Sequence, residues 1–239
     1  LGDSLEKITR EKVAVIEKGS FVVSGKQNTI VKNIINERVK KIGAHISWVE
    51  PLNETWELGL KGDFQKQNAA VALKVAQLLI KKGWGIKQDD IRKGLAMTKW
   101  PGRLELIDFD NKKILVDCAH NPSAAKVLSL EREKWQNQED GVYWIIGVQK
   151  QKNINLIIKN LIKAFDKVLL VPVPNQESWS LSDISEISER NLDNFIEFRN
   201  FIEAFNYLKN LRDWPKCIPV LTGSIFLVSE FIKHSKSNQ

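Results

Sequence analysis

The sequence has little cysteine. Its two cysteines, Cys118 and Cys217, lie far apart and belong to no CxxC or other zinc-ligand spacing. This predicts a reduced, cytoplasmic protein in which both thiols fill core positions. The chain also lacks an apolar run long enough to span a membrane, a recognisable signal peptide and an internal repeat. Membrane proteins, disulfide-rich secreted domains and repeat arrays are therefore excluded as interpretations.

The charge is positive and unevenly placed. The 239 residues are 43% hydrophobic and carry a formal net charge of +7, with +6 in residues 1–97 and +1 in residues 98–239. The basic part would suit nucleic acid or a polyanionic small molecule. A solvated surface rich in lysine is the simpler interpretation. No aromatic residues are interleaved to stack bases, so we predict no nucleic-acid partner.

The first part of the chain mixes helices and short strands. The apolar spacing predicts helices at 4–18, 28–41, 64–82 and 88–97, and strands at 21–24, 45–50 and 55–60. Asp3 or Ser4 is expected to cap the first helix. Trp100-Pro101-Gly102 then breaks the helical pattern and suits a hinge. We therefore expect one domain over residues 1–97 and a second over residues 98–239.

The second part alternates regularly. Strands are predicted at 103–108, 113–117, 142–147, 167–173 and 217–221, and helices at 122–136, 153–164, 182–190, 200–211 and 224–234. Apolar strands alternating with helices indicate an α/β fold with a mainly parallel sheet covered on both faces. Ligands bind such sheets beyond the carboxyl ends of the strands.

One stretch places polar groups at such an end. KKILVDCAHNPSAAKVL, residues 112–128, runs from an apolar strand into Asp117, His120 and Asn121 and then into a helix. Asn121 can cap this helix, whose amino terminus favours an anion such as phosphate, with His120 beside it and Asp117 available to a ribose hydroxyl. Alternatively, Asn121 merely caps a helix and His120 is a loop residue. The residues alone leave both interpretations open.

Four sequence blocks carry a family resemblance. They are LGDSLEKITREKVAVIEKGSFVVSG (1–25), LKGDFQKQNAAVAL (60–73), PGRLELI with ILVDCAHNPSAAKVL (101–128), and LTGSIFLVSE (221–230). In this order they resemble the folylpolyglutamate synthase/dihydrofolate synthase family of the Mur ligase superfamily. The resemblance implies a carboxyl-terminal, Rossmann-like domain with a mainly parallel sheet, preceded by the end of the central nucleotide-binding α/β domain.

The resemblance also implies an activity. The family is an ATP-dependent carbon–nitrogen ligase of folate biosynthesis and one-carbon metabolism, which adds L-glutamate to dihydropteroate or to the γ-carboxyl of folylglutamates through an acyl phosphate. The implied cofactors are ATP and Mg²⁺, with a monovalent cation as a further candidate. The implied partners are the small-molecule substrates, and we expect a monomer. Two alternatives stay open: another Mur-type amino acid ligase, or a non-catalytic relic that binds nucleotide or folate.

In the first half of the chain, the resemblance implies roles for residues that match the family's motifs. Lys12 matches a lysine that is carbamylated and then helps to hold Mg²⁺; Val13 and Ala14 replace the alanine and glycine that follow it. Asn68 matches the residue that contacts adenine, and Gln65 matches its neighbouring glutamine. Phe64 stands where the motif has histidine.

Further roles come from the second half. Arg103 matches the arginine that reaches the ATP phosphates, and Asp117 the acid that contacts ribose. His120 resembles a catalytic residue that faces phosphate or glutamate, and Ser224 a contact for the incoming glutamate. Gln151-Lys152-Asn153 replaces an Asp-Lys-Asp motif and keeps only its lysine.

One family element has no counterpart. The family's amino-terminal phosphate loop and the histidine that shares its metal site do not occur in the sequence, which starts without Met. We therefore expect a fragment of a longer ligase, and we expect these 239 residues alone to have no ligase activity.

Overall fold

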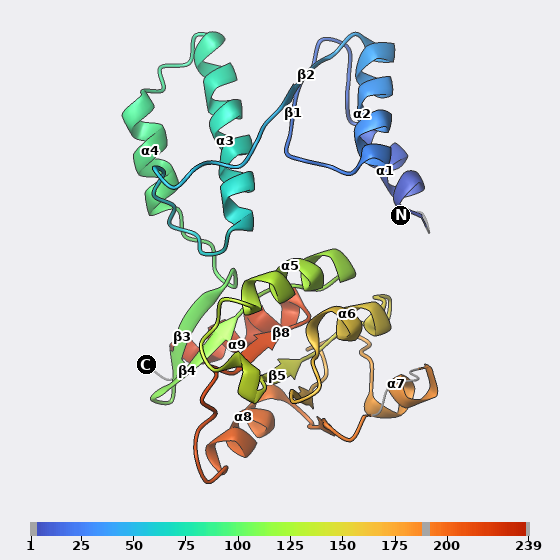
Figure 1. Cartoon of the computed structure of the whole chain (residues 1–239), viewed down its shortest axis with the longest axis vertical. Helices are drawn as coiled ribbons and strands as arrows, with labels where there is room; N and C mark the ends of the chain where they lie inside the picture. The colour runs from blue at the N-terminus through green and yellow to red at the C-terminus, as the bar shows by residue number, and fades with distance from the viewer. Residues whose placement is uncertain (1–3, 188–191, 238–239) are drawn as a thin grey trace. The chain divides into compact units, whose positions relative to one another are not determined.

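The computed structural model describes residues 4–187 and 192–237 and divides the chain into two compact units, Leu1–Lys99 and Trp100–Gln239. Figure 1 shows the elements of each unit. Within the described residues, no helix combines the length and the apolar character that crossing a membrane requires.

The first unit contains four helices and one small sheet in its described part. The elements are α1 (Leu5–Val13), β1 (Phe21–Ser24), α2 (Thr29–Ile42), β2 (His45–Trp48), α3 (Phe64–Lys81) and α4 (Gln88–Met97). Strands β1 and β2 pair in parallel. Helix α1 begins where Ser4 accepts a hydrogen bond from the Lys7 N–H, as predicted, whereas the alternative cap Asp3 lies outside the described residues. The helix ends at Val13, five residues earlier than predicted.

The strand predicted at 55–60 is wrong. These residues form turns, in which the Trp56 N–H donates to the Asn53 carbonyl and the Gly59 N–H donates to the Leu95 carbonyl of α4. A Cβ on Gly59 would lie 2.3 Å from the Thr98 carbonyl oxygen. The segment therefore packs by its backbone against the end of α4, and Leu58 and Leu60 point inward without a partner strand.

The second unit is an α/β domain. Its elements are β3 (Glu105–Phe109), β4 (Lys112–Val116), α5 (Pro122–Arg132), η1 (Gln138–Asp140), β5 (Tyr143–Ile146), α6 (Ile154–Leu161), β6 (Lys167–Leu170), α7 (Leu181–Ile187), β7 (Phe195–Glu197), α8 (Phe201–Lys209), β8 (Val220–Thr222) and α9 (Ile225–Ser237). The predicted helix at 182–190 corresponds to α7, and residues 188–190 lie outside the described part. The short strand β7 was not predicted.

The six strands form one sheet in the order β3-β4-β8-β5-β6-β7. The pair β3 and β4 is an antiparallel hairpin, whose turn residues Asp110 and Asn111 both have positive φ, and the other pairs are parallel. The prediction of a mainly parallel sheet is confirmed. Because β8 is last in sequence but lies between β4 and β5, the chain crosses over it when it passes from β4 through α5 to β5.

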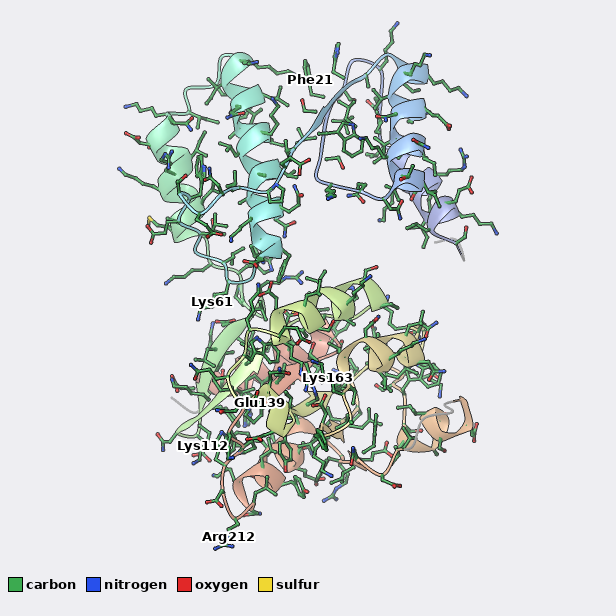
Figure 2. The ribbon with its side chains drawn as sticks, in the orientation of Figure 1. Phe21, Lys61, Lys112, Glu139, Lys163 and Arg212 are labelled. Carbon is green, nitrogen blue, oxygen red and sulfur yellow. The ribbon has the colours of Figure 1, made fainter. Side chains whose placement is uncertain are left out.

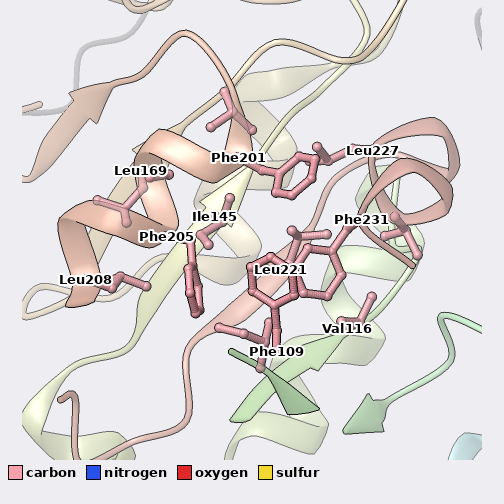
Figure 3. Close-up of a cluster of buried hydrophobic side chains, with 14 of the residues drawn as sticks. Phe109, Val116, Ile145, Leu169, Phe201, Phe205, Leu208, Leu221, Leu227 and Phe231 are labelled. Atoms are coloured by element: carbon pink, nitrogen blue, oxygen red, sulfur yellow. The ribbon is translucent and has the colours of Figure 1, made fainter. Parts of the chain in front are cut away.

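Helices cover both faces of this sheet. Helices α5 and α6 pack against each other on one face, and α8 lies on the other (Figure 1). Helices α8 and α9 contribute Phe205 and Phe231 to a buried cluster with Phe109 of β3 and Ile145 of β5 (Figure 3). The Phe109 ring meets the Phe205 ring edge-on at a centroid distance of 4.6 Å. This apolar cluster fixes the strands whose carboxyl ends carry the polar residues described next.

Candidate functional site

The predicted site residues of the second unit lie on loops that lead from the sheet to helices on its two faces. From β4 the chain enters α5 on one face of the sheet, and from the adjacent β8 it enters α9 on the other. Open α/β sheets bind ligands at such a switch point, beyond the carboxyl ends of the strands. The loops are tied together, because the Gly223 N–H donates to the Ala119 carbonyl at 3.0 Å. The predicted residues of both loops therefore lie together at the carboxyl ends of the strands.

Asp117 is held tightly at the end of β4. The side chain is buried, with Oδ1 accepting from the Ala119 N–H at 2.9 Å and Oδ2 accepting from the Leu104 N–H at 3.1 Å. Burial raises the pKa of Asp117, while the two amides and the nearby Arg103 charge act in the opposite direction. Both carboxylate oxygens thus have backbone partners before any ligand arrives.

His120 has a defined orientation. Its Nδ1 lies 2.9 Å from the Cys118 carbonyl oxygen, and its Nε2 lies 3.5 Å from the Asn121 side-chain nitrogen. A carbonyl oxygen only accepts, so Nδ1 carries the proton of this hydrogen bond. In the neutral ring Nε2 is then an acceptor, and the half-buried imidazole presents it beside the start of α5.

The start of α5 is capped as predicted. Asn121 accepts from the Ala124 N–H at 2.9 Å, and Pro122 occupies the first helical position. The amino end of α5 carries the partial positive charge of the helix dipole at the switch point. It can stabilise an anionic group placed near His120.

Ser224 is almost completely buried. It is 1% exposed, and its hydroxyl accepts from the Phe226 N–H at 3.2 Å at the start of α9. Gly223 before it has φ +103, and a Cβ there would lie 2.6 Å from the Gly147 carbonyl oxygen. Only glycine allows this approach of the loops after β5 and β8.

The first unit holds a separate cavity. Asn68 of α3 lines it and donates to the Gln65 side-chain oxygen at 2.9 Å. The cavity measures about 190 Å³ and is lined by Leu58, Leu60, Gln65, Asn68, Ala69, Ala72, Leu95 and Thr98. Sequence reasoning identified Asn68 and Gln65 but missed the leucines and Thr98. Leu58 and Leu60 did give a signal, the alternation in residues 55–60, which we interpreted as a strand.

Lys12 stands apart from Asn68. It is exposed in the last turn of α1, which packs against α2, whereas α3 packs against β1 and α4. Arg38 of α2 donates from Nη2 to the Ile16 carbonyl at 2.9 Å and so fixes the chain that follows α1. Among residues 4–187 and 192–237, no three His, Cys, Asp or Glu side chains lie together as a metal site. A carbamate on Lys12 would be one metal ligand and would need others.

The replaced Asp-Lys-Asp motif serves the fold. Asn153 caps α6 by accepting from the Leu156 N–H at 3.0 Å, and the Lys152 carbonyl accepts from the Trp179 indole at 3.0 Å. An asparagine caps a helix as well as an aspartate does. Asn153 is therefore the cap of α6 in this chain.

A second cavity lies at the amino ends of strands β5 and β6, opposite to the ends that carry the predicted site residues. It measures about 240 Å³ and is lined by Arg132, Gln138, Glu139, Gly141, Lys163, Phe165 and Asp166. Figure 2 labels Glu139 and Lys163 there. The guanidinium of Arg132 pairs with Asp166 through both terminal nitrogens, and both side chains are buried. None of the predicted site residues lines this cavity.

Comparison with known proteins links this architecture to one family. Residues 103–234 match the family model described as dihydrofolate synthetase, C-terminal domain. The chain is 27% identical over 278 residues to a dihydrofolate synthetase from Saccharomyces cerevisiae, an alignment that covers 100% of the chain and 63% of the relative.

Two solved structures have the same fold. One is a folylpolyglutamate synthase from Mycobacterium tuberculosis complexed with ADP and AMPPCP, with a TM-score of 0.80, 20% identity, and coverage of 98% of this chain and 60% of that one. The other is a bifunctional folylpolyglutamate synthase/dihydrofolate synthase from Yersinia pestis complexed with AMPPNP and Mn ion, with a TM-score of 0.78, 21% identity, and coverage of 98% and 57%. The chain thus spans about three fifths of the length of these relatives.

Proposed function

The chain belongs to the dihydrofolate synthetase C-terminal domain family, and from this premise we propose that it is part of an ATP-dependent ligase that joins L-glutamate to a folate-type carboxylate. The acceptor is dihydropteroate, the γ-carboxyl of a folylglutamate, or both. In this proposal Leu1–Lys99 is the end of the central ATP-binding domain, and Trp100–Gln239 is the carboxyl-terminal domain. The names of the relatives support the reaction class.

The orientation of His120 is the observation that carries the proposal. Its Nδ1 is engaged with the Cys118 carbonyl, so Nε2 is an acceptor beside the amino end of α5. An acceptor suits an amine that must lose a proton, and the helix end suits the negative charge of a phosphate. The two features lie side by side at the switch point of the sheet, where an acyl phosphate and an attacking amine would have to meet.

The reaction has two steps. A carboxylate oxygen of the acceptor attacks the γ-phosphorus of ATP, and ADP leaves. The glutamate amine then attacks the carbonyl carbon of the acyl phosphate, loses a proton to His120 Nε2 and expels inorganic phosphate. Ser224, at the start of α9, is assigned to the glutamate side of this site.

Each unit, taken by itself, offers candidate nucleotide contacts. The cavity that Asn68 lines has mostly apolar walls and the side-chain amides of Gln65 and Asn68, which suits a flat aromatic base that both donates and accepts. Arg103, half-buried two residues before β3, offers a planar guanidinium for phosphate oxygens. The M. tuberculosis relative, crystallised with ADP and AMPPCP, supports a nucleotide role for this fold.

Lys12 would take part in divalent cation binding. As a carbamate it would be anionic, and oxygen donors of this kind suit Mg²⁺. The cation would supply positive charge that neutralises the phosphates. The Y. pestis relative, crystallised with Mn ion and a nucleotide analogue, supports a divalent cation in this family. Phosphate oxygens are natural further ligands.

A substrate panel tests the proposal. The protein at its natural length is incubated with ATP and L-glutamate and with dihydropteroate, a folylmonoglutamate or a cell-wall peptide precursor, and ADP release is measured. The proposal expects ADP release with either folate-type acceptor and only when glutamate is present. Turnover of the cell-wall precursor alone would support a different Mur-type ligase, and nucleotide binding without turnover would support a non-catalytic relic.

A further inference from the structure

Arg103 lies in a bend whose neighbouring residues are buried. Gly102 on one side of Arg103 is buried and has φ +71, and Leu104 on the other is 5% exposed and has φ +42. A Cβ on Gly102 would lie 2.6 Å from Val228 Cγ1, so the bend packs closely against α9. Positive φ is a strained conformation for a bulky side chain such as leucine. Strain of this kind persists only where contacts of the fold enforce it.

One enforcing contact comes from the side chain of Glu105. The Gly102 N–H donates to Glu105 Oε2 at 2.7 Å, across the bend that carries Arg103. Glu105 is half-buried and is the first residue of β3, where its backbone pairs with Val116 of β4. The carboxylate is therefore carried by the β3–β4 hairpin, and it fastens the residue that precedes Arg103. We call this hydrogen bond the Glu105 pin.

The guanidinium of Arg103 depends on its own backbone for its position. Within residues 4–187 and 192–237, no hydrogen bond or ion pair holds this side chain. Burial raises the pKa of Asp117 and of Cys118, and the Arg103 charge opposes the rise in both, so the guanidinium lies close to the carboxyl end of β4. Its N–H donors are therefore available to phosphate oxygens at the end of the sheet where ligands bind.

We propose that Glu105 is a positioning residue, which fastens the Gly102 backbone and so directs Arg103 toward the phosphates of the nucleotide. The inference rests on the proposed function, in which Arg103 binds those phosphates. A planar guanidinium binds phosphate oxygens in a defined geometry, so a displaced backbone weakens every hydrogen bond of the contact. Without the pin, the bend gains conformational freedom that must be lost again when the phosphates bind.

Two substitutions of nearly equal size separate the pin from the bulk of the side chain. Glu105→Gln keeps an uncharged oxygen that can accept from the Gly102 N–H, whereas Glu105→Met offers only a weakly accepting sulfur. Both keep an unbranched side chain that can pack at this half-buried position, so both are expected to fold. Asp108→Met is the matched control, because Asp108 is an exposed acid of the same strand and its side chain bonds to Lys113 rather than to the bend.

The test measures kcat and KM in the protein at its natural length. We expect Glu105→Met to raise KM for ATP about tenfold or more, the scale of one hydrogen bond to a charged group. Glu105→Gln should stay within about threefold of wild type, because a neutral hydrogen bond keeps about half of that stabilisation. KM for L-glutamate should stay unchanged in both variants. In an Arg103→Ala background, Glu105→Met should add less than about a twofold change, because the two residues act as one unit.

Equal KM values for ATP in Glu105→Gln and Glu105→Met would overturn the inference, and so would a full effect of Glu105→Met in the Arg103→Ala background. A second measurement needs no nucleotide: amide hydrogen exchange at Gly102 should be fastest in Glu105→Met, intermediate in Glu105→Gln, and unchanged in Asp108→Met. Exchange at the wild-type rate in both Glu105 variants would show that the pin does not hold the bend. A wild-type protein that fails to use ATP would instead overturn the proposed function, so the two failures are distinguishable.

Discussion

The imidazole Nδ1 of His120 lies 2.9 Å from the carbonyl oxygen of Cys118. This contact sets the tautomer of a ring that would otherwise be free to donate or accept at either nitrogen. The ring belongs to a loop that is tied to the loop after β8 through the Gly223 N–H and the Ala119 carbonyl. The acceptor nitrogen is thus fixed at the switch point before any substrate binds.

The substitution His120→Asn separates the structural and chemical roles of this ring. The asparagine NH₂ can replace Nδ1 as donor to the Cys118 carbonyl, but nothing replaces Nε2. We expect the melting temperature to change little and kcat to fall by about 10²- to 10⁴-fold, the usual contribution of a general base. Steady-state ligation in the protein at its natural length measures the effect, and His45→Asn, at an exposed position of the first unit, is the control. An unchanged kcat in His120→Asn would show that His120 takes no part in the reaction.

Lys12→Ala tests the carbamate. Removing the proposed carbamate ligand of the divalent cation should lower kcat about a hundredfold or more, the scale of losing one electrostatic group that acts on a charged transition state. A short carboxylate such as acetate, added in solution, should restore part of the rate. The control is Lys7→Ala on the same helix. Wild-type rates in Lys12→Ala would contradict the metal role.

Cys118 should be nearly inert to alkylation. Burial raises the pKa of its thiol to about 11, so about 0.1% is thiolate at pH 8, and the thiolate is the form that reacts. The rate of labelling by iodoacetamide, measured by mass spectrometry of the folded protein, should rise about tenfold per pH unit between pH 8 and pH 10. Rapid labelling of Cys118 at pH 7 in the folded protein would show that the thiol is not shielded.

The same thiol makes stability depend on pH. An unfolded thiol ionises near pH 9 and the folded one near pH 11. Between these values the folded state binds more protons, so the free energy of unfolding falls as pH rises. Denaturant unfolding at pH 8 and pH 10 measures the slope, and Cys118→Ala should reduce it.

The buried pair of Arg132 and Asp166, at the amino ends of β5 and β6, should contribute strongly to the free energy of unfolding. Asp166 also accepts from the Val142 N–H at 2.9 Å and from the Trp144 indole at 3.0 Å. Asp166→Asn leaves the buried guanidinium without its counter-charge, and we expect a loss of about 3–5 kcal/mol in the free energy of unfolding. The exposed pair of Asp108 and Lys113 is the control, where Asp108→Asn should cost no more than about 1 kcal/mol. Both losses are measured by urea unfolding. Equal losses in the free energy of unfolding for Asp166→Asn and Asp108→Asn would contradict this prediction.

Local sequence signals predicted much of the fold. Asn121 and Pro122 marked the start of α5 because a side-chain cap and a proline at the first helical position are local requirements. The apolar runs that became β5 and β6 predicted buried parallel strands in the same way. Strand β7 has three residues, Phe195–Glu197, which is too short for a periodic signal. Residues 55–60 alternate like a strand, but no neighbouring strand pairs with them.

The candidate site was less predictable. A family motif pointed to Asp117 and Arg103, yet the hydrogen bond from the Leu104 N–H to Asp117 joins residues 13 positions apart and depends on how β3 and β4 pair. The predicted strand from residue 103 begins at Glu105, because Leu104 adopts positive φ. Nothing local in the sequence reports this conformation, since leucine rarely adopts it.

The proposed ligase reaction depends on an acyl phosphate intermediate. The most direct measurement follows an oxygen atom: the acceptor carboxylate is labelled with ¹⁸O, the protein at its natural length is given ATP and L-glutamate, and the released inorganic phosphate is analysed by mass spectrometry. We predict one ¹⁸O atom in each phosphate released, because the carboxylate oxygen leaves with the phosphoryl group. Amide product formed together with unlabelled phosphate would contradict it.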